Sequence, residues 1–119
     1  MYRYALLDVL EVVDGDTVDC RISLGFGLTA ALRFRLSGVD CPEVYGPDAS
    51  EAGQEAARFT QEWLDTHSGI ELISHKGARD TIGIGDGAFG RWLATIIADD
   101  GTSLNVALVG AGHAKEVES

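Results

Sequence analysis

Two short acidic clusters in the sequence have the residue types and spacing of a metal site. The first is Asp14-Gly15-Asp16, and the second is Asp40-Cys41-Pro42-Glu43. Carboxylates that converge repel one another unless a cation neutralises them, and an all-oxygen cluster is typical of Ca²⁺ or Mg²⁺. The alternative interpretation is that the first cluster is only a tight turn and the second only the approach to a helix.

Two arginines could act beside such a cation. Arg35 stands shortly before the second acidic cluster, and Arg91 follows a glycine in Phe89-Gly90-Arg91-Trp92. A guanidinium group can bind two phosphate oxygens with its planar fork, and it can stabilise the negative charge of a transition state. The alternative is that Arg35, like Arg33, is a solvent-facing strand residue and that Arg91 only pairs with surface acids.

Short strands must position these residues. Residues 4–13 form an apolar run that ends at Asp14-Gly15, a dipeptide typical of hairpin turns. Residues 18–24 alternate between apolar and polar side chains, and a turn at 25–27 follows. In the next run, Leu32, Phe34 and Leu36 share one face. The sequence therefore predicts an antiparallel meander of three strands, and the acidic clusters meet if the third strand pairs with the first or second.

The rest of the chain predicts two helices and two more strands. Residues 47–66 have apolar side chains at helical spacings, and Asp48 and Glu51 have the spacing of a capping box near the start. Strands are predicted at 70–74 and 91–98, and a short helix at 104–111 with Ser103 as its N-cap. This order predicts an α+β fold, mainly β: a five-stranded OB-type barrel with one long helix and one short C-terminal helix.

Length and composition narrow the classes of protein. The 119 residues predict a single domain over 1–119, and the 9 Lys and Arg against 19 Asp and Glu give a net charge of −10. No apolar run is long enough to span a membrane, and Asp8 comes too early for a signal peptide. We therefore expect a cytoplasmic protein without a membrane partner. For the oligomeric state, a monomer is the default. The acidity opposes a nucleic-acid binder that relies on a broad basic face.

Six short motifs follow one another along the chain. They are Val13-Asp14-Gly15-Asp16-Thr17, Phe34-Arg35-Leu36, Val39-Asp40-Cys41-Pro42-Glu43, Tyr45-Gly46-Pro47-Asp48-Ala49-Ser50, Phe89-Gly90-Arg91 and Asn105-Val106-Ala107-Leu108-Val109. In this order they closely resemble the staphylococcal (micrococcal) nuclease family, from about residue 9 to Lys115. The resemblance implies an OB-fold barrel with helices packed on it and a Ca²⁺-dependent phosphodiesterase acting on DNA and RNA.

The resemblance also implies a set of metal-binding residues. Asp16 and Asp40 correspond to direct carboxylate ligands of Ca²⁺, and Cys41 would contribute its backbone carbonyl. Asp14 would hold the water shell of the metal, and Thr17 would support the ligands beside it.

Three residues carry the catalytic roles that the resemblance implies. Glu43 matches the residue usually assigned as the general base, which takes a proton from the attacking water. Arg35 and Arg91 would bind the phosphate and stabilise its five-coordinate transition state. One departure is that Ala88-Phe89 stands where the family usually has a lysine-tyrosine pair that contacts phosphate.

Two other classes of function stay open. The chain could be a catalytically weak or inactive nuclease-like OB-fold module that only binds protein or nucleic acid, although the acids and arginines that such modules usually lose are retained here. The acidic surface could also imitate nucleic acid and occupy a basic partner. Because the charge outside the predicted site is itself negative, we expect weak substrate affinity and a strong dependence on divalent cation.

Overall fold

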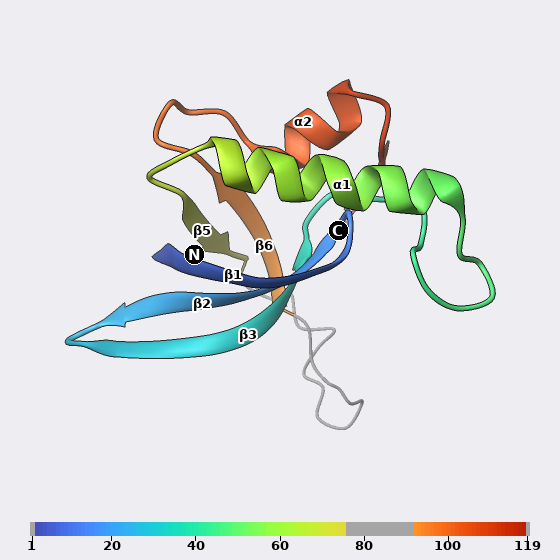
Figure 1. Ribbon diagram of the computed structural model, residues 1–119. Helices are drawn as coiled ribbons and strands as arrows, with labels where there is room; N and C mark the ends of the chain where they lie inside the picture. The colour runs from blue at the N-terminus through green and yellow to red at the C-terminus, as the bar shows by residue number, and fades with distance from the viewer. Residues whose placement is uncertain (1, 76–91, 119) are drawn as a thin grey trace.

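The computed structural model of the chain describes residues 2–75 and 92–118 (Figure 1). Its strands are β1 (Tyr2–Asp14), β2 (Thr17–Gly25), β3 (Leu28–Leu36), β4 (Val39–Asp40), β5 (Glu71–Ser74), β6 (Trp92–Ile97) and β7 (Lys115–Glu116), and its helices are α1 (Glu51–Thr66) and α2 (Leu104–Gly110). Five strands close into a barrel in the order β1-β2-β3-β6-β5. The predicted α+β fold, with a five-stranded OB-type barrel and a long and a short helix, is confirmed.

The first three strands form the predicted antiparallel meander. Val12 pairs with Val18 between β1 and β2, and Thr17 pairs with Arg35 between β2 and β3. β3 and β6 run parallel to each other, while β5 pairs antiparallel with both β6 and β1 and so closes the barrel. The hairpin turn between β1 and β2 and the end of β3 therefore lie at the same end of the meander.

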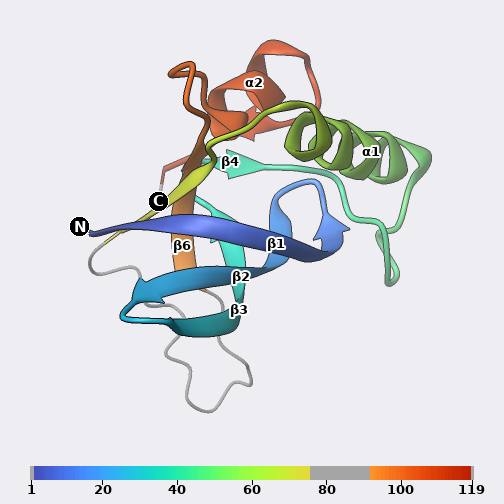
Figure 2. The same cartoon turned by 60° about the vertical axis from the view of Figure 1, so that its left-hand side comes forward.

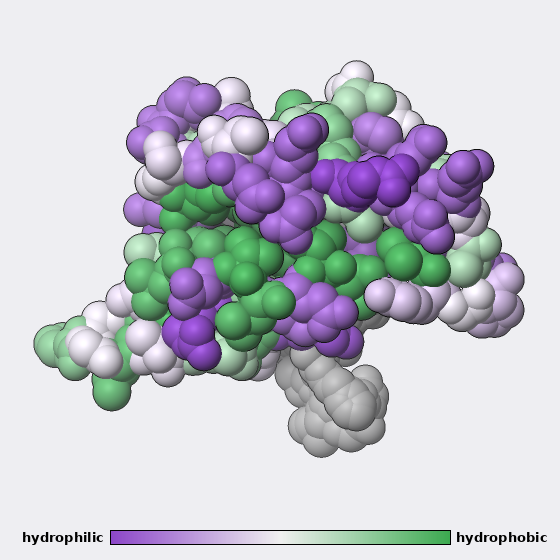
Figure 3. Space-filling model, viewed as in Figure 1, coloured by the Kyte–Doolittle hydropathy of each residue, from purple (hydrophilic) through white to green (hydrophobic). Residues whose placement is uncertain are grey.

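The hydrophobic core fills the barrel and continues under the two helices. It is made of apolar side chains on β2, β3, β5, β6, α1 and α2: Val18, Cys20, Ile22, Phe34, Leu36, Leu72, Ala94, Ile96, Ala56, Trp63, Leu64, Leu104 and Leu108. Figure 2 shows both helices on one side of the barrel, and in Figure 3 hydrophilic residues cover the outer face of α1 above a band of hydrophobic atoms. The helices thus cover one opening of the barrel and hold the strand ends below them.

The structure differs from the predicted elements in three places. α1 begins at Glu51 rather than at 47, and its N-cap is Ser50, whose hydroxyl accepts a hydrogen bond from the backbone N–H of Gly53, so the predicted cap at Asp48 is wrong. Leu32 is 37% exposed, although Cys20, its partner across β2 and β3, is fully buried. Strands β4 and β7 were not predicted, since each has only two residues.

The described helices give no sign of a membrane-spanning segment. Within residues 2–75 and 92–118, neither α1 nor α2 is long and apolar enough to cross a bilayer.

Candidate active site

The turn between β1 and β2 is pressed against helix α1. Its Gly15 carbonyl oxygen accepts a hydrogen bond of 2.7 Å from the buried Thr60 hydroxyl on the helix. A Cβ atom at Gly15 would lie 2.8 Å from Cβ of Ala56 and 2.9 Å from Sγ of Cys41. Contacts this short require a residue without a side chain. The sequence predicts Gly15 as a turn residue, but the close approach of α1 is a second reason for glycine.

Asp16, in the same turn, is a buried carboxylate surrounded by donors. Only 5% of the residue is exposed. Its Oδ2 accepts a hydrogen bond of 2.8 Å from the backbone N–H of Cys41, and its Oδ1 accepts one of 3.1 Å from the Thr17 hydroxyl. Burial raises the pKa of Asp16 above its ordinary value, while the Cys41 N–H and the charge of Arg35 act in the opposite direction. The removal of water is the strongest of these effects.

Arg35, on β3, bridges the two acidic clusters. Its Nη1 lies 3.2 Å from Oδ2 of Asp16, and its Nη2 lies 3.3 Å from Oδ1 of Asp40. Nη1 also donates a hydrogen bond of 3.1 Å to the backbone carbonyl of Val39. The structure therefore brings Asp16, Asp40 and Arg35 together. The Asp40 side chain is 53% exposed, so one side of this group is open to solvent.

Arg33 lies two residues before Arg35 but has a different partner. Its Nε and Nη2 donate hydrogen bonds of 2.7 and 3.0 Å to the two carboxylate oxygens of Asp19. This bidentate pair is exposed. Of the two arginines at this end of β3, only Arg35 lies at the acidic clusters.

Asp14, at the end of β1, and Glu43, in the segment after β4, are the remaining carboxylates of the two acidic clusters. Oδ1 of Asp14 accepts a hydrogen bond of 2.8 Å from the backbone N–H of Val44, which ties the end of β1 to the segment after β4. Among the described residues, the exposed Glu43 side chain makes no hydrogen bond or ion pair, although its backbone carbonyl accepts a bond of 3.1 Å from Ser50. Glu43 is therefore held through its main chain, with its carboxylate open to solvent.

Two residues that support the site carried no assigned role from the sequence. Gly53, in the first turn of α1, is so close to the Glu43 carbonyl that a Cβ atom there would overlap its oxygen. The signal available was a glycine inside a predicted helix, where glycine is unfavourable unless something packs against it.

The second such residue is Asn105, which is 6% exposed at the start of α2. Its Oδ1 accepts a hydrogen bond of 3.1 Å from the backbone N–H of Ile96, and its Nδ2 donates bonds of 2.9 Å to the Ser37 carbonyl and 3.2 Å to the Ala94 carbonyl. Asn105 therefore joins α2 and β6 to the turn between Arg35 and Asp40. It occurs in the sixth motif, but neither pattern nor spacing indicated these bonds.

The described side chains do not form a metal site by themselves. Among residues 2–75 and 92–118, no group of three or more His, Cys, Asp or Glu side chains could hold a metal ion together. Asp16 and Asp40 are the carboxylates that converge on Arg35. Arg91 and the Ala88-Phe89 pair lie outside the described residues.

Comparison with known proteins adds to this geometry. The family described as staphylococcal nuclease homologue matches residues 33–119. Endonuclease YhcR of Bacillus subtilis (strain 168) is 30% identical over 107 residues, which cover 87% of this chain. The chain spans 8% of the length of that relative. Together with the closed barrel and the acidic residues around Arg35, these matches show that the chain belongs to the staphylococcal nuclease family.

Proposed function

We propose that the chain is a Ca²⁺-dependent nuclease that hydrolyses phosphodiester bonds of DNA, RNA or both. The observation that carries the proposal is the position of the Arg35 guanidinium, 3.2 Å from Asp16 and 3.3 Å from Asp40. A cationic fork between carboxylates at the ends of different elements suits the binding of a phosphate beside a metal ion. The name of the Bacillus relative, an endonuclease, supports the same class of reaction.

The donor atoms around Arg35 are of the kind that a hard cation binds. Asp16 and Asp40 would bind Ca²⁺ together with the backbone carbonyl of Cys41, while Asp14 would hold its water shell and Thr17 would keep Asp16 in place. All of these donors are oxygen atoms, and water completes the shell of such ions. A divalent cation would also stabilise the ionised form of Asp16, whose pKa burial raises. Bound there, Ca²⁺ would supply Lewis-acid stabilisation of the phosphate.

Side chains of the protein would accept the proton of the attacking water and stabilise the negative charge that develops at the phosphate. The exposed Glu43 carboxylate takes the proton of the attacking water, whose oxygen forms a bond to phosphorus as the P–O5′ bond breaks. Arg35 and Arg91 bind the phosphate oxygens and stabilise the additional negative charge of the five-coordinate transition state, and Arg91 also assists the departing 5′-oxygen. The products of this step carry a 3′-phosphate.

Cleavage of labelled single-stranded DNA and RNA at low salt, with millimolar Ca²⁺ or with EDTA, tests the proposal. We expect Ca²⁺-dependent cleavage, and we expect Glu43→Gln to lower kcat by about 10²–10⁴-fold, because a positioned general base contributes about that much. Glu55→Gln is the matched control, since Glu55 is an exposed carboxylate on α1. It should leave kcat unchanged.

Two results would contradict the proposal. A folded chain that cuts neither substrate in Ca²⁺ is not a nuclease, and if it still binds the oligonucleotide, the alternative of a nuclease-like binding module holds instead. Equal losses of kcat in Glu43→Gln and Glu55→Gln would remove the specific role of Glu43.

A further inference from the structure

The basic residues of the described chain differ in whether an acid neutralises them. Within residues 2–75 and 92–118 the Lys and Arg residues are Arg3, Arg21, Arg33, Arg35, Arg58 and Lys115. The first four each lie within 4 Å of an Asp or Glu oxygen. In the part of the chain that the structure describes, Arg58 and Lys115 have no such partner. On a protein with a net charge of −10, these two are the described cations, besides the proposed phosphate-binding Arg35, that could contact an anionic ligand.

Lys115 lies directly across from the proposed metal ligand Asp40. In the small sheet that β7 forms with β4, Asp40 pairs with Lys115 and Val39 pairs with Glu116. Residues directly opposite in an antiparallel pair lie on the same face, with Cβ atoms about 4.5–5.5 Å apart. The register therefore places Lys115 beside the carboxylate that Arg35 contacts.

The neighbouring residue confirms which face Lys115 occupies. Glu116 lines a shallow apolar hollow of about 350 Å³ together with Val39, Val106 and Val109. Successive side chains of a strand point to opposite faces. Lys115 therefore lies on the face away from this hollow, the face of the Asp40 carboxylate, and it is exposed there.

We propose that Lys115 is a further substrate-binding residue, whose ammonium group binds a phosphate of the nucleic-acid strand next to the phosphate held at Arg35. This inference rests on the proposed nuclease function. Lys115 makes no ion pair with Asp40, whose carboxylate lies 3.3 Å from Arg35, so its charge stays free for substrate. A lysine acts on phosphate as a mobile point charge at the end of a flexible stem, which suits a neighbouring backbone phosphate better than the reacting one.

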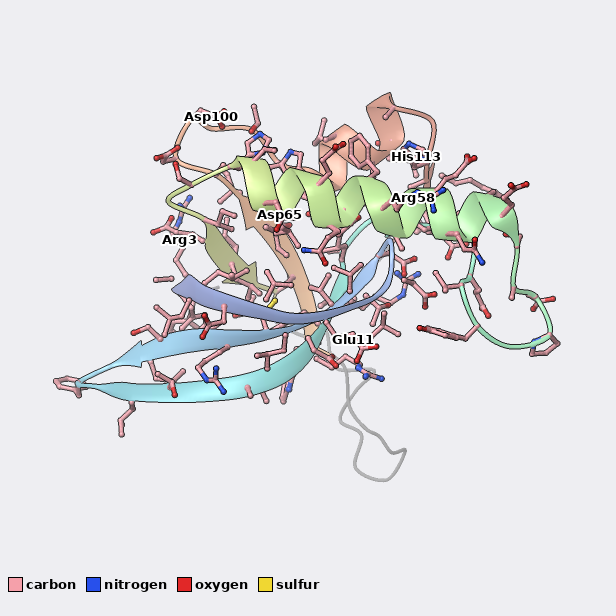
Figure 4. The ribbon with its side chains drawn as sticks, in the orientation of Figure 1. Arg3, Glu11, Arg58, Asp65, Asp100 and His113 are labelled. Atoms are coloured by element: carbon pink, nitrogen blue, oxygen red, sulfur yellow. The ribbon has the colours of Figure 1, made fainter. Side chains whose placement is uncertain are left out.

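Arg58 provides a matched control for the loss of one positive charge. It also lacks an acidic partner, but it lies on α1 in a surface hollow with Glu55, Glu62 and His113, and Figure 4 shows it beside His113. Arg58→Gln and Lys115→Gln change the net charge equally. A difference between them therefore reports the position of the charge rather than its sum.

The first experiment measures binding without turnover. A labelled single-stranded oligothymidylate is titrated by fluorescence anisotropy with the Glu43→Gln chain at fixed Ca²⁺ and increasing NaCl. Each phosphate contact contributes about 0.7 to the slope of log K against log[salt] for a single strand. We expect Lys115→Gln to reduce the slope by about 0.7, and Lys115→Arg and Arg58→Gln to leave it unchanged. An unchanged slope in Lys115→Gln would overturn the proposal.

The second experiment separates substrate binding from the positioning of Asp40. In the otherwise wild-type chain, Lys115→Gln should raise KM about fivefold, the scale of one exposed ionic contact, with kcat unchanged. A fall in kcat, or a higher Ca²⁺ requirement, with KM unchanged would instead assign Lys115 to holding Asp40. Equal KM changes in Lys115→Gln and Arg58→Gln would show an effect of total charge. Either result overturns the proposal that Lys115 binds a substrate phosphate but leaves the proposed nuclease activity standing. A wild-type chain that neither binds nor cuts the strand would overturn both proposals.

Discussion

At the scale of single residues, Asp16 combines a charge with deep burial. Its contacts with Cys41, Thr17 and Arg35 do not fully replace the water that it loses, and its pKa is accordingly raised above 3.8. A neutral side chain of the same shape avoids that cost. We therefore expect Asp16→Asn to reduce nuclease activity by about 100-fold or more, through loss of a metal ligand, without lowering stability.

The pH dependence of stability checks the same residue. Because folding raises the pKa of Asp16, the folded chain holds that proton more tightly than the unfolded chain does. The stability of the wild type relative to Asp16→Asn should therefore fall as the pH rises from about 4 through the raised pKa, and then stay level. Urea unfolding of both chains in EDTA at several pH values measures this difference. A difference that grows in favour of the wild type with rising pH would contradict the assignment.

The two free cysteines give a second test at this scale. Burial raises the pKa of both Cys20 and Cys41 to about 12, and the acids near each thiol add to the effect. Since the thiolate is the reactive form, iodoacetamide at about pH 8 should leave both thiols unmodified in the folded chain and should modify both in urea. Mass spectrometry counts the labels. Rapid labelling of the folded chain would show that these side chains are accessible.

At the scale of elements, the first turn of α1 holds the segment that carries Glu43. Gly53→Ala places a methyl group against the Glu43 carbonyl oxygen, so either the backbone at Glu43 or the first turn of α1 must shift. We expect a loss of about 1–3 kcal/mol in the free energy of unfolding from overpacking, together with a lower kcat. Urea unfolding and steady-state kinetics measure the two effects.

Gly110 is the control for that substitution. It ends α2 with open space where a Cβ atom would stand. Gly110→Ala should therefore raise stability by about 0.5–1 kcal/mol and leave activity unchanged, since alanine favours the helix without a clash. If Gly53→Ala were also stabilising, the contact with Glu43 would have no energetic importance.

The hydrogen bonds of Asn105 give a further prediction about how α2 is held to β6 and to the turn at Ser37. Its amide accepts a hydrogen bond from the buried Ile96 N–H and donates to the carbonyls of Ser37 and Ala94, and Asn105→Leu would remove all three bonds and take from the Ile96 N–H the acceptor that it has here. We expect a loss of about 2–4 kcal/mol in the free energy of unfolding. Urea denaturation measures it, and a loss below about 1 kcal/mol would show that water replaces the amide.

At the scale of the whole molecule, the net charge of −10 acts against a polyanionic substrate. Glu55, Glu62 and Asp65 line one surface hollow on α1, on the face where Figure 4 labels Arg58 and Asp65. Replacing them together by Gln, Gln and Asn should lower KM about twofold at low salt with kcat unchanged, because long-range repulsion slows encounter. The effect should vanish at high salt, where charges are screened. Kinetics at two ionic strengths measure it, and an effect that persists at high salt would contradict this explanation.

The predictions from sequence succeeded where local chemistry decides the outcome. The alternation in residues 18–24, the Asp14-Gly15 turn and the helical spacing before Thr66 each depend on neighbours in the chain. β2, the first hairpin and the end of α1 appear where they were predicted. The start of α1 was wrong by a few residues, because Ser50 and Asp48 are both good caps and packing against Glu43 selects Ser50.

The amino-acid sequence alone was enough to predict the five barrel strands, the two helices and their order, because residue types and spacings encode strand faces, turns and caps. The types and order of its motifs also named the candidate residues. Only the tertiary structure decided which charges meet: Arg35 lies between Asp16 and Asp40, whereas Arg33 lies with Asp19. It also decided that Lys115 stands opposite Asp40. These pairings join segments far apart in the chain, and such contacts are fixed by barrel closure and strand register, which no local pattern contains.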